Sequence, residues 1–127
     1  MKILIVDDDE DIREILGLIL RAKGHQVDEA GDGVDALGYL RAEDRPRLVI
    51  LDMMMPRLDG EGVIRAMRGD AWFAEIPVVV LSGHQSAREL AARLGVAGCL
   101  VKPVEVSDLL EMVRRIDTLS AERPRSP

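Results

Sequence analysis

The sequence predicts an α/β domain in which helices cover both faces of a single parallel sheet. Five short stretches, most of them rich in Val, Ile and Leu, alternate with amphipathic helical patterns along almost the whole chain. Four of these stretches lack polar alternation, which is typical of strands that are buried on both faces. Regular alternation of strands and helices favours one doubly wound parallel sheet, and right-handed crossovers leave few possible topologies.

The five expected strands are short. They lie at residues 3–6, 25–29, 48–51, 78–81 and 99–101. The second stretch, His25-Gln26-Val27-Asp28-Glu29, is the most polar of them. A polar strand fits poorly between two layers of helices, so we place it at an edge of the sheet.

Five helices are expected because apolar residues recur three and four positions apart after each strand. They cover residues 12–20, 34–42, 62–68, 87–94 and 106–113. Gly24 and Gly95 stand where a glycine commonly follows the last turn of a helix. The helix over residues 34–42 contains Gly38, which lowers its helical propensity.

Length and composition indicate one globular domain. The 127 residues have a net charge of −6, one cysteine and three aromatic residues. A single cysteine excludes an intrachain disulfide and leaves too few ligands for a Cys/His zinc cluster. The acidic balance argues against direct nucleic-acid binding, and no apolar run approaches the roughly 18 residues of a membrane span. We therefore expect a cytoplasmic protein with one domain over residues 1–119, followed by a flexible tail or linker at 120–127.

Polar side chains follow four of the expected strands, where ligands bind in open α/β sheets. They are Asp7, Asp8 and Asp9 after the first, Asp52 after the third, Ser82 after the fourth and Lys102 after the fifth. Each has a simpler explanation: the acids could cap a helix, the serine could belong to an ordinary loop, and the lysine could be a surface residue. Capping needs only one or two acids, so the combination favours a functional site.

Crowded carboxylates repel one another, and burial raises their pKa values unless a cation is bound. Ligands that are all oxygen atoms indicate a hard divalent ion, and we expect Mg²⁺ or Mn²⁺. A lysine at the same place balances charge when an anion joins the metal. Metal, aspartate nucleophile, hydroxyl and lysine together fit phosphoryl transfer.

The motifs around these residues resemble those of response-regulator receiver domains, the phosphoacceptors of two-component signalling. They are Ile5-Val6-Asp7-Asp8-Asp9, Leu51-Asp52-Met53-Met54-Met55-Pro56 with Asp59-Gly60, Val80-Leu81-Ser82-Gly83, and Leu100-Val101-Lys102-Pro103. The resemblance extends over about residues 2–116. It implies a flavodoxin-like fold with strand order 2-1-3-4-5.

The resemblance also implies what each acidic residue does. Asp52 would take a phosphoryl group from a phosphohistidine of a sensor histidine kinase or a phosphotransfer protein. Asp8, Asp52 and the main-chain carbonyl of Met54 would bind Mg²⁺, and Asp7 would assist through water. The domain would hydrolyse its own phosphoaspartate slowly, as a signalling protein rather than an enzyme with a separate substrate.

The same resemblance assigns the switch. Lys102 would pair with the phosphoryl group and Ser82 would hydrogen-bond to it, while the Lys102–Pro103 peptide bond is expected to be cis. Movement of Ser82 would rearrange a distant face built from residues 85–94 and 98–119. The downstream protein target is not identified by these motifs.

Five further positions are notable. Cys99 stands where the family usually has an aromatic switch residue, and a small buried hydrophobe is a simpler interpretation of it than a redox role. Met54 and His84 occupy positions where the family tunes dephosphorylation, although a lone loop histidine is commonly just solvated. Trp72 and Phe73 are expected to form a partly exposed apolar pair.

Three alternatives to a self-contained receiver stay open. The chain could be the receiver portion of a longer regulator whose output domain is absent. It could be an aspartate-nucleophile phosphohydrolase, but those enzymes typically carry a second acid where this chain has Met54. It could also be an interaction module that works without phosphorylation, against which the joint presence of Asp8, Asp52, Ser82 and Lys102 argues.

Overall fold

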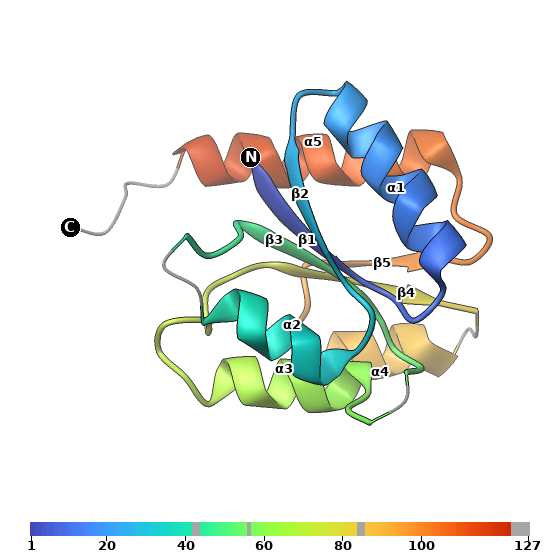
Figure 1. The fold of residues 1–127 in the computed structure, drawn as a ribbon. Helices are drawn as coiled ribbons and strands as arrows, with labels where there is room; N and C mark the ends of the chain where they lie inside the picture. The colour runs from blue at the N-terminus through green and yellow to red at the C-terminus, as the bar shows by residue number, and fades with distance from the viewer. Residues whose placement is uncertain (42–43, 56, 84–85, 123–127) are drawn as a thin grey trace.

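Five strands alternate with five helices over the residues that the computed structural model describes, which are 1–41, 44–55, 57–83 and 86–122. In chain order they are β1 (Lys2–Val6), α1 (Glu10–Ala22), β2 (Gln26–Ala30), α2 (Gly33–Leu40), β3 (Leu48–Asp52), α3 (Gly60–Arg68), β4 (Val78–Ser82), α4 (Ser86–Leu94), β5 (Gly98–Val101) and α5 (Val106–Glu122) (Figure 1). No helix in these ranges is long and apolar enough to cross a membrane.

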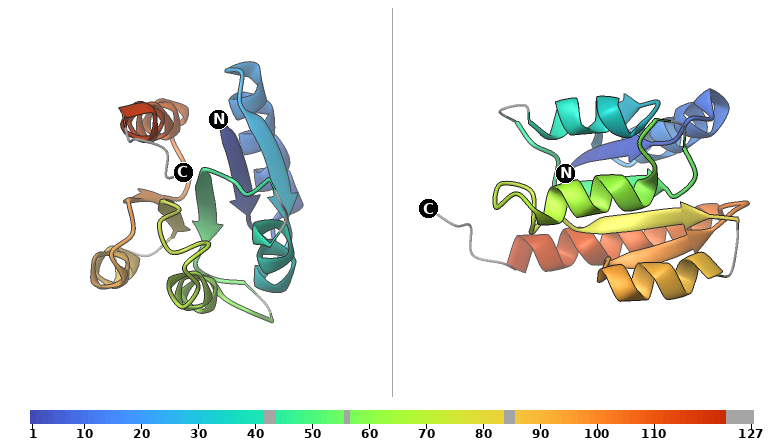
Figure 2. Two further views of the ribbon diagram at one scale, coloured as in Figure 1. Left: turned by 90° about the vertical axis from the view of Figure 1, so that its left-hand side faces the viewer. Right: turned by 90° about the horizontal axis from the view of Figure 1, so that it is seen from below.

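The strands form one parallel sheet in the order β2-β1-β3-β4-β5, which confirms the predicted topology. The polar strand β2 is at an edge, as expected from its composition. Helices α1 and α5 cover one face of the sheet, and α2, α3 and α4 cover the other (Figures 1 and 2). Because all the strands are parallel, their carboxyl ends lie at the same edge of the sheet.

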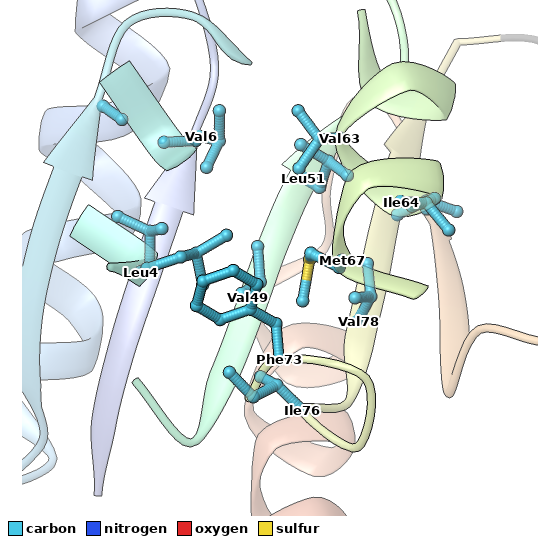
Figure 3. Packing of buried hydrophobic residues seen from close by; sticks show 14 of the residues in the cluster. Leu4, Val6, Val49, Leu51, Val63, Ile64, Met67, Phe73, Ile76 and Val78 are labelled. Atoms are coloured by element: carbon cyan, nitrogen blue, oxygen red, sulfur yellow. The ribbon is translucent and has the colours of Figure 1, made fainter. Parts of the chain in front are cut away.

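Alternate side chains of each strand enter different cores, as the two-residue period of a strand requires. On β1, Leu4 and Val6 pack toward α2 and α3, whereas Ile3 and Ile5 pack toward α1 and α5. Figure 3 shows the first core, in which α3 and the loop after it contribute further apolar side chains. Each fully buried aliphatic side chain contributes roughly 1.5–3 kcal/mol, so both cores hold the strand ends in place.

Two sequence-based expectations need correction. Phe73 is buried in the core instead of forming an exposed pair with Trp72, because the segment after α3 folds back over the sheet (Figure 3). Helix α5 continues to Glu122, so the position predicted for the start of the tail, residue 120, lies within that helix. The extent of the domain, at 1–119, stays a prediction.

Candidate functional site

Four strand ends bring their polar residues to one edge of the sheet. Asp52 and Ser82 are the last residues of β3 and β4, and Asp7 and Lys102 directly follow β1 and β5. Within the described part of the chain, the buried polar or charged residues are Asp7, Asp52 and Ser82, which expose 0%, 5% and 4% of their surface. Burial thus singles out the residues that the sequence motifs place at the strand ends.

The acidic run after β1 divides into a helix cap and a pair of possible metal ligands. Asp9 is the N-cap of α1, and its Oδ1 accepts hydrogen bonds from the main-chain nitrogens of Asp11 and Ile12. Oxygen atoms of Asp7, Asp8 and Asp52, one from each, lie within 4.8 Å of one another. Capping therefore explains Asp9, and it does not explain the two acids before it.

Lys102 compensates part of the negative charge of this cluster. Its Nζ lies 2.9 Å from Asp7 Oδ2 and 3.5 Å from Asp52 Oδ1. Desolvation acts to lower the pKa of Lys102, but the contacts with Asp7 and Asp52 outweigh it and raise the pKa above its usual value. The side chain is therefore a protonated ammonium group at neutral pH.

Asp52 is the carboxyl group most affected by this environment. Its pKa is raised to about 6, first by desolvation and then by the charge of Asp7. A hydrogen bond from the Met54 main-chain nitrogen to Oδ1, at 3.2 Å, and the charge of Lys102 oppose the rise. One ammonium group is thus insufficient to compensate three neighbouring carboxylates.

The residues present fit a bound divalent cation. Asp7 Oδ2 is buried, and its contact with Lys102 is an ion pair without a hydrogen bond of good geometry. A buried carboxylate oxygen with unused acceptor capacity, together with two carboxylates within reach, is a donor set suited to a hard cation. The cation would be held by Asp7, Asp8 and Asp52. The main-chain carbonyl of Met54 and a water-mediated contact of Asp7 stay predictions.

Other predicted site residues have different surroundings. The Lys102–Pro103 peptide bond is cis, as expected. Met54 has an exposed side chain beside the acidic cluster, whereas His84 lies outside the described residues. Cys99 is half-buried against one core, and desolvation raises the pKa of its thiol although Arg88 opposes this. A neutral thiol in contact with apolar side chains favours a packing role over a redox role.

Cys99 also lines a groove of about 560 Å³ beside β5. The groove is bordered by Arg88 of α4 and Met112 of α5, and Lys102 contributes to its wall. The lysine that contacts the acidic cluster therefore also contributes to the surface between α4 and α5.

Two arginines near the site were not expected from the motifs. Nη1 of Arg13, on α1, donates a hydrogen bond to the main-chain oxygen of Asp7 at 2.7 Å. Arg57, in the loop after β3, has a positive φ of 66° and pairs with Asp32 at the start of α2. The available signal for Arg13 was its place one turn after the helix cap, where helical side chains lean back toward the preceding strand.

Comparison with known proteins gives one consistent family. The model of the response regulator receiver domain family matches residues 3–114. The response regulator MprA of Mycobacterium tuberculosis strain H37Rv is 42% identical over 118 residues, which cover 91% of this chain and 50% of MprA. MprA of Mycobacterium sp. strain KMS is 41% identical over 133 residues, covering 100% of this chain and 56% of that protein. The chain thus spans about half the length of these curated relatives.

Solved structures agree with this result. The signal receiver domain of a signal transduction histidine kinase from Syntrophus aciditrophicus superposes with a TM-score of 0.87 at 30% identity, covering 99% of this chain and 96% of that one. The chemotaxis protein CheY4 of Vibrio cholerae gives a TM-score of 0.83 at 29% identity, with coverage of 91% and 97%. Both are similar to this chain along nearly their full lengths.

Proposed function

The chain belongs to the response regulator receiver domain family, and from that premise we propose that Asp52 is its phosphoacceptor. The observation that carries the proposal is the position of Asp52: it is buried at the end of β3, 3.5 Å from the Lys102 ammonium and beside two further carboxylates. Within the described ranges, Asp7 is the other carboxylate that combines burial, a contact with Lys102 and a place in the possible metal site. Each of the two accepts one main-chain hydrogen bond on Oδ1, so the choice of Asp52 over Asp7 rests on the resemblance of the motif around Asp52 to the phosphoacceptor motif of the family.

The proposed reaction transfers a phosphoryl group from a histidine of a sensor kinase or phosphotransfer protein. A carboxylate oxygen of Asp52 forms the new bond to phosphorus as the phosphorus–nitrogen bond breaks. The leaving imidazole keeps the electron pair of that bond and takes a proton from solvent. Asp7, Asp8 and Asp52 would hold a Mg²⁺ ion, which would supply positive charge for the phosphoryl oxygens.

Lys102 and Ser82 serve the same reaction. The Lys102 ammonium is placed to attract the phosphoryl oxygens, since it already contacts Asp52 and Asp7. Ser82, buried at the end of β4, would donate its hydroxyl proton to a phosphoryl oxygen. Both residues therefore favour the product, an acyl phosphate that the domain hydrolyses slowly.

The partner is proposed to dock beside the acidic cluster, on α1. Ile15 and Leu18 of this helix expose 56% and 67% of their surface, although both are large and apolar. The helix starts directly after the loop that carries Asp7 and Asp8. A partner that covers this apolar surface could bring its phosphohistidine to the same edge of the sheet.

Phosphorylation is proposed to change the surface formed by α4, β5 and α5. Lys102 connects this surface to the site, because it contacts Asp52 and also lines the groove beside Cys99. Amide hydrogen exchange with and without a phosphodonor tests this step. Equal exchange along α4, β5 and α5 in both states would contradict it.

The phosphoacceptor proposal is tested by incubating the chain with Mg²⁺ and acetyl phosphate. We expect a mass increase of one phosphoryl group, which Asp52→Asn abolishes. The matched control is Asp9→Asn, since asparagine caps a helix as well as aspartate and Asp9 is a cap. An unmodified wild-type chain would overturn the proposal and leave an interaction module that works without phosphorylation. A modified Asp52→Asn variant would overturn it by showing that another residue takes the phosphoryl group.

A second candidate is that this chain is the receiver portion of a longer regulator. It is supported by the length of the curated relatives, of which the chain covers about half. Sequencing the coding DNA beyond residue 127 tests it. An in-frame output domain would support the candidate, and a stop codon at that point would exclude it.

A further inference from the structure

Helix α1 presents two arginines to the edge strand β2. Arg13, Gly17 and Arg21 are four residues apart and so lie on one face of the helix. A Cβ on Gly17 would lie 3.4 Å from Glu29 Oε2, so the helix approaches β2 closely at this point. Both arginines flank Glu29, which explains how a polar strand packs against α1. Figure 1 shows α1 beside β2.

The two arginines differ in what else they contact. Arg21 Nη2 lies 3.2 Å from Glu29 Oε2 and donates a hydrogen bond to the Val27 main-chain oxygen at 2.9 Å. Arg13 is only a distant partner of Glu29, with 3.9 Å between Nε and Oε1, and its buried Nε has no hydrogen-bond partner among the described residues. The close contact of Arg13 is with the main-chain oxygen of Asp7, at 2.7 Å.

The hydrogen bond from Arg13 is the second of two that hold the main chain of Asp7. The Asp7 nitrogen donates a hydrogen bond to the Ala30 oxygen at 3.2 Å, and Arg13 holds the Asp7 oxygen. The Asp7 carbonyl belongs to the same planar peptide unit as the nitrogen of Asp8. The guanidinium therefore sets the orientation of the peptide that joins two carboxylates of the cluster.

Asp8 depends on this peptide more than its neighbours do. It is exposed, and no hydrogen bond or ion pair of its side chain occurs within the residues that the structure describes. Asp7 and Asp52, by contrast, are buried and each contacts Lys102. The direction of the Asp8 side chain thus follows from the backbone that carries it.

We propose that Arg13 is a positioning residue for the cation site, which acts by holding the Asp7–Asp8 peptide. The inference rests on the proposed function in one respect, that the cation site is used for phosphoryl transfer. The expected consequence is specific to metal affinity. Groups that orient metal ligands typically change affinity by 10- to 100-fold, and we expect about tenfold because one of three carboxylates is affected.

The test is a calorimetric titration of the unphosphorylated full chain with Mg²⁺. We expect Arg13→Met to raise the Mg²⁺ dissociation constant about tenfold. The matched control Arg21→Met also removes a positive charge and a contact with Glu29, but it leaves the Asp7 carbonyl bonded. We expect this control to stay within about twofold of the wild type.

The sign of the effect separates positioning from simple electrostatics. Removing a positive charge near the cluster would by itself strengthen Mg²⁺ binding, in both variants. Weaker binding in Arg13→Met alone therefore supports positioning, and unchanged or tighter binding in this variant overturns it. Arg13→Lys, which keeps one donor for the Asp7 oxygen, is expected to bind Mg²⁺ more tightly than Arg13→Met does.

A second readout covers the case in which Arg13→Met does not fold. The amide resonance of Asp8 should shift in Arg13→Lys and stay in place in Arg21→Lys, and equal shifts would overturn the inference. The Mg²⁺ titration needs no phosphodonor, so it can fail while Asp52 is still phosphorylated by acetyl phosphate. A wild-type chain that binds no Mg²⁺ would overturn this inference together with the cation part of the proposed function.

Discussion

Each edge of the sheet has a lysine placed between two aspartates, yet the two clusters differ in their surroundings. At the carboxyl edge, Lys102 lies 2.9 Å from Asp7 and 3.5 Å from Asp52. At the amino edge, Lys2 lies 3.4 Å from both Asp28 and Asp44. The lysines are similarly exposed, but the acids of the first cluster are buried and those of the second are open to solvent.

Burial of the acids, more than the set of charges, distinguishes the candidate functional site from the cluster at the amino edge. Solvent stabilises the carboxylates at the amino edge, so the ion pairs there contribute little. At the carboxyl edge, Asp52 has lost its solvent and keeps a raised pKa of about 6 despite Lys102. A bound cation would stabilise the ionised form of such a desolvated carboxyl group. An exposed carboxylate is already stabilised by solvent.

The largest expected effect comes from removing Lys102, the lysine that contacts the buried acids. Lys102→Met should lower the rate of phosphorylation by acetyl phosphate by about a hundredfold, since one charged contact with the developing phosphoryl oxygens is lost. It should also lower the free energy of unfolding by about 3 kcal/mol without Mg²⁺, because Asp7 and Asp52 stay buried without a partner. Mass spectrometry over time and urea denaturation measure the two effects.

The matched variant for this experiment is Lys2→Met at the opposite edge. This variant also removes one lysine charge, but it does so at the end of the sheet away from the acidic cluster. The phosphorylation rate should therefore be unchanged. Equal rates for Lys102→Met and the wild type would contradict the role assigned to the buried cluster.

The second prediction uses the pKa of Asp52. Its value of about 6 lies above the 3.8 of an ordinary aspartate, so the folded protein binds more protons than the unfolded chain between these pH values. The free energy of unfolding should therefore fall as the pH rises from about 4 to about 6. Ionisation of Asp52 should lower the free energy of unfolding by up to about 3 kcal/mol, at 1.36 kcal/mol for each tenfold difference in proton affinity between the folded and unfolded states.

Asparagine does not ionise, so Asp52→Asn avoids this loss of stability. The variant should be more stable than the wild type at pH 7 without Mg²⁺. Urea denaturation of both proteins from pH 4 to pH 8 measures the difference. A wild-type curve parallel to that of Asp52→Asn over the whole range would show that Asp52 titrates normally.

The third prediction concerns the cation. At a Mg²⁺ concentration ten times the dissociation constant, the wild type should gain about 1.4 kcal/mol of stability. Asp52→Asn should gain less, because one of its three carboxylates is missing. Thermal denaturation with and without Mg²⁺ tests this, and an equal gain in both proteins would place the cation elsewhere.

The fold and the main residues of the site were predictable from the sequence for a physical reason. Parallel strands buried on both faces are continuous apolar runs, and their ends mark where polar residues begin. Asp52, Ser82 and Lys102 each end or follow such a run, so their meeting point follows from the parallel sheet alone. The family motifs added the strand order, which local patterns do not contain.

Contacts made by long side chains were not predictable in the same way. The place of Arg13 one turn after the helix cap indicates the direction of its side chain, but it does not specify the main-chain oxygen of Asp7 as the hydrogen-bond partner. The burial of Phe73 depends likewise on the course of the segment after α3. The length of α5 was underestimated for a different reason: apolar periodicity fades near Asp117, but the last residues of the helix include the good helix formers Leu119, Ala121 and Glu122.

The smallest effect is expected at the amino edge. Lys2→Met removes ion pairs with Asp28 and Asp44 and a hydrogen bond to the Asp44 main-chain oxygen. Exposed pairs contribute up to about 1 kcal/mol, so the free energy of unfolding should fall by less than that. Dissolved salt screens exposed charges, and the Debye length is about 3 Å at an ionic strength of about 1 M. The difference in stability between Lys2→Met and the wild type should therefore shrink further in about 1 M NaCl. A loss of about 3 kcal/mol, equal to that of Lys102→Met, would show that exposure of the acids does not distinguish the two edges.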